Sequence, residues 1–171
     1  MRQHALIAMM ASALAWLAAP ALAQSPPPEP DVPAAIQVPG AAPVMTIHAQ
    51  GAQIYACAAD PATAKLAWAF REPIAALLID GKTIGRHYAG PIWELDNSGK
   101  LQGKVIARAA GAAAGDIAWL KLEAIAPATG PLAGMRFIQR IHTHGGALEG
   151  ECQQAGQLRA IAYSADYVFL R

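Results

Sequence analysis

Short apolar runs separated by turn residues extend from about residue 44 to the C-terminus. Within several runs, apolar and polar residues alternate with a period of two, which is typical of a strand with one buried face. Met45, Ile47 and Ala49 alternate in this way before Gly51, where we expect a hairpin turn. The pattern predicts an all-β, single-domain β-barrel or β-sandwich of about eight or nine strands.

A second hairpin is predicted in the middle of the chain. Residues 92–95 and 101–109 flank the small polar residues 96–99, which tolerate tight-turn conformations. In the returning strand, alternate residues from Leu101 to Ala109 are expected to face inward, with Arg108 facing water and Ile106 breaking the alternation. Further strands are predicted at residues 53–58, 68–70 (stopped at Pro73), 74–80, 120–124, 135–143 and 158–170.

The N-terminal segment has the features of an export signal. Residues 1–4 form a short basic region with Arg2, residues 5–19 form an apolar region, and Ala21-Leu22-Ala23 precedes a cleavage site. We therefore expect a signal peptide over 1–23, since about 15 apolar residues fall short of the roughly 20 that a spanning helix needs. A periplasmic or secreted protein with no membrane span after cleavage follows from this.

Residues 24–43 are rich in proline and hold seven of the 13 prolines of the chain. This composition favours extended backbone over a packed core. We predict a Pro-rich linker over 24–43 and a β-domain over 44–171.

The charge balance argues against nucleic acid as a partner. Loss of Arg2 with the signal peptide leaves 12 basic and 12 acidic side chains, so the mature chain has no net charge. We expect a monomer whose partner is an unknown small molecule or envelope component.

Cys57 and Cys152 are the two cysteines of the chain. In an exported protein an even pair favours a disulfide over the alternatives, a metal site or two free thiols. Closing a loop of about 95 residues would stabilise the fold by about 4 to 5 kcal/mol in the chain-entropy model.

Residues 86–94 gather the side chains that best suit a binding site. His87, Tyr88, Trp93 and Glu94 surround a Gly-Pro turn, where a rim of β-structure can direct several side chains to one place. We predict His87, Tyr88, Glu94 and Arg140 as ligand-binding candidates. His87 and Glu94 would face a pocket while Trp93 lies mainly in the core; the alternative is a purely structural turn.

His142 and His144 share a spacing that zinc, copper or nickel could use. Against this, Arg136 and Arg140 are expected on the same strand face, where their charges would repel a cation. A metal site at His142 and His144 is therefore only a weak alternative, and we expect no metal or cofactor.

Several motifs resemble those of a domain-of-unknown-function family of secreted bacterial and fungal proteins. They are Ile54-Tyr55-x-Cys57, His87-Tyr88-Ala89-Gly90-Pro91-x-Trp93-Glu94, Ile117-x-Trp119-Leu120-x-Leu122, Ile138-Gln139-Arg140-x-x-Thr143-x-Gly145-Gly146, Cys152 and Tyr163-x-Ala165-Asp166-Tyr167-x-Phe169. The resemblance runs from about Gly51 to the C-terminus and implies one whole domain with a Cys57–Cys152 pairing, but no assigned reaction. His142 stands where the family pattern has Asn.

No nucleophile elbow or phosphate loop is present in the sequence, so we do not predict an enzyme. An exported β-domain that binds a small molecule, glycan or envelope component is the first hypothesis. An envelope-polymer hydrolase using Glu94 with Asp116 or Asp166 is the second. A protein-binding module, such as a periplasmic inhibitor, is the third.

Overall fold

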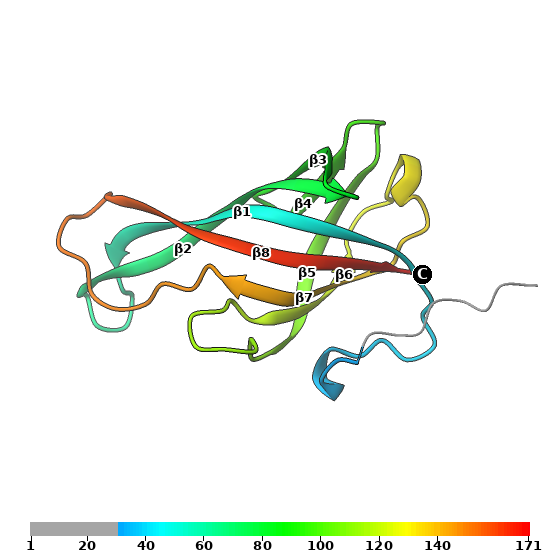
Figure 1. The fold of residues 1–171 in the computed structure, drawn as a ribbon. Helices are drawn as coiled ribbons and strands as arrows, with labels where there is room; N and C mark the ends of the chain where they lie inside the picture. Colours follow the sequence, from blue (N-terminus) through cyan, green and yellow to red (C-terminus); the bar gives the residue numbers. More distant parts are fainter. Residues whose placement is uncertain (1–30) are drawn as a thin grey trace, which may run out of the picture.

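The computed structural model describes residues 31–171, so the predicted signal peptide lies outside the described residues. Eight antiparallel strands close into a barrel in which each strand pairs with the next and β8 pairs with β1 (Figure 1). They are β1 (Pro43–Ala59), β2 (Leu66–Ile79), β3 (Lys82–Tyr88), β4 (Ile92–Leu95), β5 (Lys100–Ala109), β6 (Trp119–Ala124), β7 (Phe137–Gly145) and β8 (Leu158–Leu170). The all-β prediction is confirmed. Within residues 31–171, no helix is long and apolar enough to cross a membrane.

One end of the barrel is filled by apolar side chains. The connection between β6 and β7 contains a short 3-10 helix, η2 (Gly130–Leu132), and its Leu132 and Met135 are buried. Both belong to the same core cluster as Leu77 of β2 and Leu101 of β5. This connection therefore closes the end of the barrel at which β1 starts and β8 finishes.

Two residues expected to interrupt strands lie inside long ones instead. β1 runs for 17 residues through Gly51, and β2 runs for 14 residues through Pro73. A Cβ atom on Gly51 would lie 2.1 Å from the carbonyl oxygen of Ile74, so this glycine permits a close approach of β1 and β2 rather than a turn. Pro73 pairs with Gln53 close to a bulge in β2, where Arg71 has no partner in β1 and the regular ladder is interrupted. The predicted breaks at Gly51 and Pro73 are wrong.

A bulge in β5 reverses which side chains face inward. The pairing with β6 shifts between Val105 and Ala107, and Ile106 is exposed at this point. Beyond the bulge, Ala107 and Ala109 pack against a cluster on the outside of the barrel, while Arg108 lines an internal cavity. The expected inward faces of Ala107 and Ala109 are therefore wrong, because one extra residue changes the parity of the strand.

Residues 31–42, from the predicted linker, pack on the outer face of the barrel. They contain the 3-10 helix η1 (Ala34–Ile36). The buried side chains of this segment are Val32, Ile36 and Val38. Gln139 Nε2 donates to the carbonyl oxygen of Ile36 at 2.8 Å, and Lys121 Nζ donates to that of Gln37 at 3.1 Å. The expectation of an unpacked linker therefore does not hold for residues 32–38, while 24–30 lie outside the described residues.

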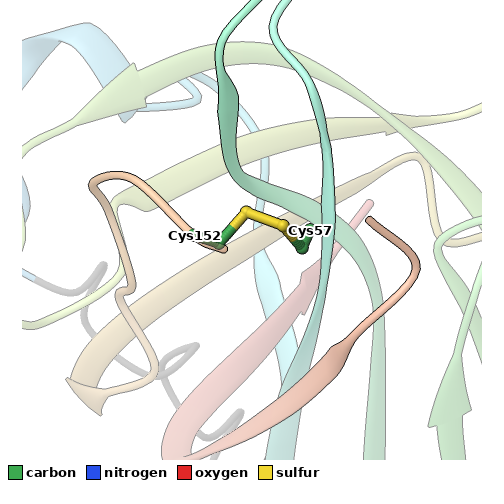
Figure 2. The surroundings of a disulfide bond; sticks show 2 residues. All are labelled: Cys57 and Cys152. Carbon is green, nitrogen blue, oxygen red and sulfur yellow. A yellow bond between two sulfur atoms is a disulfide. The ribbon is translucent and has the colours of Figure 1, made fainter. Parts of the chain in front are cut away.

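Cys57 and Cys152 form the predicted disulfide, with Cα atoms 5.8 Å apart (Figure 2). Cys57 lies near the end of β1, and Cys152 lies in the connection from β7 to β8. The backbone N–H of Cys152 also donates to the carbonyl oxygen of Leu66 in β2. The disulfide therefore fixes a long loop to the strands beside it.

Candidate functional site

A cavity of about 1310 Å³ lies inside the barrel, and we call it the lumen. Its lining includes the loops at residues 89–91, 110–116 and 147–149, all at the end of the barrel opposite η2. An eight-stranded barrel is just wide enough to be filled by side chains or to hold one small ligand. Apolar packing fills the closed end here, and the lumen occupies the open end.

Three aromatic rings from β3, β4 and β8 pack together at the lumen wall. The His87 ring stacks on Trp93 with centroids 4.8 Å apart, and Tyr167 lies 4.9 Å from His87 and 5.1 Å from Trp93. All three side chains are buried and line the lumen. Gly103 makes room for this cluster, because a Cβ atom there would lie 3.0 Å from the Trp93 ring.

His87 is neutral at neutral pH. Its Nδ1 lies 2.9 Å from the carbonyl oxygen of Ile92, and a carbonyl can only accept, so Nδ1 carries the proton. Burial, assisted by the nearby charge of Arg140, lowers the pKa of His87 to about 4. The Nε2 atom of this tautomer is an acceptor.

Several buried polar groups around the lumen have no hydrogen-bond partner within residues 31–171. They are Gln53 Nε2, Trp93 Nε1, Tyr163 Oη and Tyr167 Oη. Tyr163 lies within weak hydrogen-bonding reach of Tyr167 and Gln53, and Tyr167 within that of Arg140, but none of these contacts has regular hydrogen-bond geometry. Burial raises the pKa of both tyrosines, so their hydroxyls stay protonated. An unpaired buried polar atom costs about 1 to 3 kcal/mol.

Arg140 points into the lumen from β7. Its Nε and Nη2 atoms both donate to the carbonyl oxygen of Ala118, at 3.1 and 2.8 Å. Within residues 31–171 it forms no ion pair with a carboxylate. Its positive charge also acts to lower the pKa values of Tyr55, His87 and Tyr167. Arg140 is therefore a fixed cation at the lumen wall.

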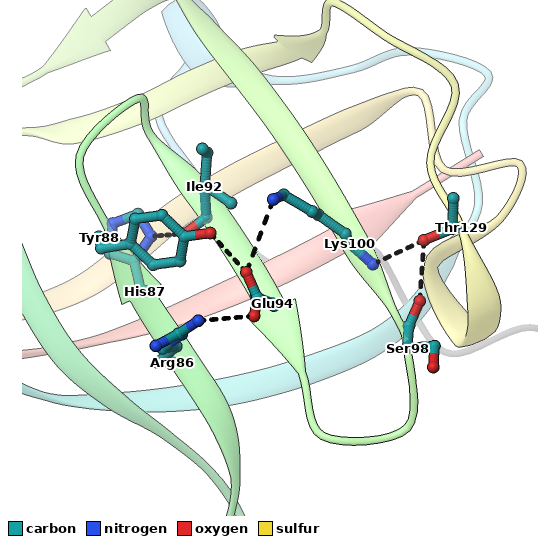
Figure 3. Close-up of polar contacts among 8 residues, drawn as sticks. All are labelled: Arg86, His87, Tyr88, Ile92, Glu94, Ser98, Lys100 and Thr129. Carbon is teal, nitrogen blue, oxygen red and sulfur yellow. Dashed lines mark hydrogen bonds and ion pairs between the residues drawn. The ribbon is translucent and has the colours of Figure 1, made fainter.

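Glu94 is the centre of a polar cluster outside the lumen (Figure 3). Its carboxylate accepts from Tyr88 Oη at 2.5 Å and Arg86 Nη2 at 2.8 Å, and Lys100 Nζ lies 3.6 Å away. The bond from Tyr88, followed by that from Arg86, lowers the pKa of Glu94. These contacts link β3, β4 and β5 and satisfy the carboxylate.

The structure separates the four predicted ligand-binding residues into two pairs. His87 and Arg140 line the lumen, whereas Tyr88 and Glu94 do not. His87 of β3 lies opposite Trp93 of β4, and the next residues along, Arg86 and Glu94, lie opposite each other. Because neighbouring residues of a strand point to opposite faces, His87 faces the lumen and Glu94 faces outward. The hypothesis that His87 and Glu94 face one pocket is wrong. Trp93 is fully buried, as expected.

His142 and His144 follow a different geometry from the one predicted. The register of β7 shifts between Ile141 and His144, and His142 adopts a positive φ of 48°. His142 Nδ1 lies 3.0 Å from Asp166, whose other oxygen lies 2.9 Å from His48 Nδ1. Arg140 faces the lumen and does not share the face of His142. Within the described part of the chain, no three His, Cys, Asp or Glu residues are arranged to hold a metal.

Gln53 and Tyr167 are lumen residues that sequence reasoning did not assign to a site, and Trp93, expected mainly in the core, also lines the lumen. Gln53 has a signal, since it is a polar residue on the inward face of β1 between Gly51 and Tyr55. Tyr167 and Trp93 resemble ordinary core aromatics in sequence. Their unpaired polar atoms emerge only when the strands are brought together.

Residues 38–171 match the model of a family described as a protein of unknown function, DUF3455. The chain belongs to this family. No curated protein and no solved structure matches this DUF3455 chain. Its function must therefore be argued from its own residues.

Proposed function

We propose that this domain binds a small molecule in the lumen and does so as an exported, disulfide-bonded protein. The observation that supports this most directly is the set of Gln53, Trp93 and Tyr167, each almost fully buried, lining the cavity and carrying an unpaired polar atom. Small-molecule sites combine apolar surface with a few polar groups that fix the orientation of the ligand, and the lumen wall contains both kinds of surface. A ligand in the lumen would satisfy them.

A hydrolase has less support from the same geometry. Glu94 lies outside the lumen, in ion pairs with Arg86 and Lys100. Asp116 lines the lumen, but its two oxygens accept the backbone N–H groups of Gly145 and Ala113 at 2.7 and 3.0 Å. This carboxylate therefore holds the β5–β6 loop in place. Asp166 pairs with two histidines and does not line the lumen.

The proposal is tested by filling the lumen with a larger side chain. Val105 lines the lumen, and its neighbour Ile106 is exposed. Compounds from a small-molecule library that raise the melting temperature of the parent should also stabilise Ile106→Trp but not Val105→Trp. At a ligand concentration of 100 times Kd, the stabilisation is about 2.7 kcal/mol.

Val105→Trp and the control Ile106→Trp change neighbouring positions of one strand, so any general effect of an added indole should occur in both variants. Equal stabilisation of both variants by the same compounds would place their binding elsewhere and overturn the proposal.

A further inference from the structure

The charge of Arg140 has no counterpart in the lumen. The guanidinium is held by the Ala118 carbonyl oxygen, a neutral acceptor. The other charged groups that line the cavity are Arg71, Arg108, Asp116 and Glu149. Arg71 is paired with Glu72, with Nε and Oε1 3.1 Å apart, and both oxygens of Asp116 accept backbone N–H groups. Arg140 forms no ion pair within residues 31–171, and its charge acts on the buried His87 and Tyr167.

The buried polar atoms at the lumen wall that lack a regular hydrogen bond are suited to donating. Trp93 Nε1 can only donate, and the Gln53 side-chain nitrogen likewise carries N–H groups without an acceptor. The Tyr167 hydroxyl stays protonated because burial raises its pKa. A fixed guanidinium surrounded by neutral donors matches a group with several acceptor oxygens and one negative charge.

Part of the lumen wall is aliphatic. Val105, Ile117, Leu120 and Leu122 line it from β5, β6 and the loop between them. A ligand in the lumen can therefore contact both Arg140 and aliphatic side chains, and Leu120 is the cross-strand neighbour of Arg140.

We propose that the lumen takes a small organic acid whose carboxylate pairs with Arg140 and accepts from Gln53, Trp93 or Tyr167, while its apolar body packs on the aliphatic wall. This inference rests on the proposed binding function of the lumen. It adds the chemical class of the ligand, a monocarboxylate with an apolar body.

Matched acids and amides test this class. The mature, oxidised protein, labelled with ¹⁵N, is titrated with 3-phenylpropanoate and with 3-phenylpropanamide, and with hexanoate and hexanamide. The readout is the indole N–H resonance of Trp93, assigned from the variant Trp93→Phe, with the resonances of Trp68 and Trp119 as internal references. Each acid should shift the Trp93 resonance and bind at least tenfold more tightly than its amide.

Substitution of the arginine separates charge from shape. Arg140→Gln should lower the affinity for the acids at least tenfold and leave the affinity for the amides unchanged. Arg140→Lys keeps the charge without the planar guanidinium, so its affinity for the acids should lie between those of the parent and Arg140→Gln. Arg136→Gln removes the same charge from an exposed position outside the lumen and should bind like the parent. Where Arg140→Gln does not fold, the acid and amide comparison in the parent decides.

The outcomes distinguish the two proposals. Acids and amides that shift the Trp93 resonance with equal affinity leave lumen binding intact and overturn the carboxylate assignment. Acid binding that survives Arg140→Gln overturns it as well. If none of the four probes shifts the Trp93 resonance, while library compounds bind the parent and not Val105→Trp, the carboxylate assignment is wrong and the proposal of lumen binding stands. If library compounds also fail to bind in the lumen, both the carboxylate assignment and the proposed binding function are wrong.

Discussion

His87 is a neutral histidine placed between two aromatic rings and close to a fixed cation. Its Nδ1–H group donates a hydrogen bond to the Ile92 carbonyl oxygen, and its ring stacks on Trp93. Burial disfavours the charged form of the ring, and the nearby charge of Arg140 adds to this effect, so the pKa of His87 is lowered in the folded protein. The residue therefore links the chemistry of the lumen to the stability of the barrel.

His87 should make the folded state sensitive to acid. Its pKa is about 4 when folded, against an ordinary value of about 6.5 when unfolded, so protons bind the unfolded chain more tightly. The stabilisation is complete above pH 6.5 and is lost as the pH falls towards 4, by about 3 kcal/mol in total. Urea unfolding between pH 7 and 4.5 should show a shallower loss of stability in His87→Gln than in the parent.

Exposed His144 supplies the control for this measurement, because His144→Gln removes an imidazole without changing the lumen. The loss of stability in acid should be the same in His144→Gln as in the parent. An identical pH dependence in all three proteins would contradict the assignment of a buried neutral imidazole to His87.

Residue types in the 86–94 stretch were enough to indicate a polar concentration, but not which side chains meet. Strand alternation predicts only that His87 and Tyr88 point to opposite faces of the sheet, and that Trp93 and Glu94 do so as well. The missing information was the pairing of β3 with β4, which sets His87 opposite Trp93 and Arg86 opposite Glu94. Arg140 joins His87 only through barrel closure, because the two lie on strands far apart in sequence.

Strands were predictable from period-two patterns, while their irregularities were not. The hairpin between β4 and β5 was visible in the polar turn at residues 96–99. The bulge at Ile106 coincides with the one break in the alternation of this strand, but the pattern alone does not show that the strand gains a residue there and turns Arg108 towards the lumen. The prediction of a turn at Gly51 is wrong for a similar reason, because sequence alone does not distinguish a glycine that permits close approach of two strands from a glycine in a turn.

The η1 segment is a packed part of the domain, and its removal should be costly. Ile36 is fully buried on the outer face of the barrel beside Ile141 and Val168. Ile36→Ala should lower the free energy of unfolding by about 2 to 5 kcal/mol, whereas Val44→Ala, at a more exposed position, should cost far less. Thermal or urea unfolding measures both.

Limited proteolysis gives an independent check on this segment. Cleavage in the parent should stop before residue 32 and extend towards residue 42 in Ile36→Ala. Rapid trimming of the parent to residue 42 would show that the segment does not pack in solution.

The disulfide acts at the scale of the whole molecule, because it closes a loop with a sequence separation of 95. The double variant Cys57→Ala, Cys152→Ala should be about 4 to 5 kcal/mol less stable in the chain-entropy model. Urea unfolding measures the difference, and intact mass without reductant should show no free thiol in the parent. Equal stability of the two proteins would mean that the barrel does not depend on this link.

The disulfide also bears on ligand binding, since the connection that holds Cys152 contributes Leu148 and Glu149 to the lumen. A looser connection would change the shape of the mouth. The double variant should therefore bind lumen ligands more weakly than the parent, with the Trp93 resonance as the reporter.

The central claim is that the barrel encloses a binding site for a small acid, and a crystal structure of the mature protein grown with 3-phenylpropanoate tests it most directly. The account predicts density for the ligand in the lumen, with its carboxylate within hydrogen-bond distance of Arg140 and its ring against Val105 and Leu120. A lumen occupied by water alone at saturating 3-phenylpropanoate, or a ligand bound on the outer face near Glu94, would contradict it.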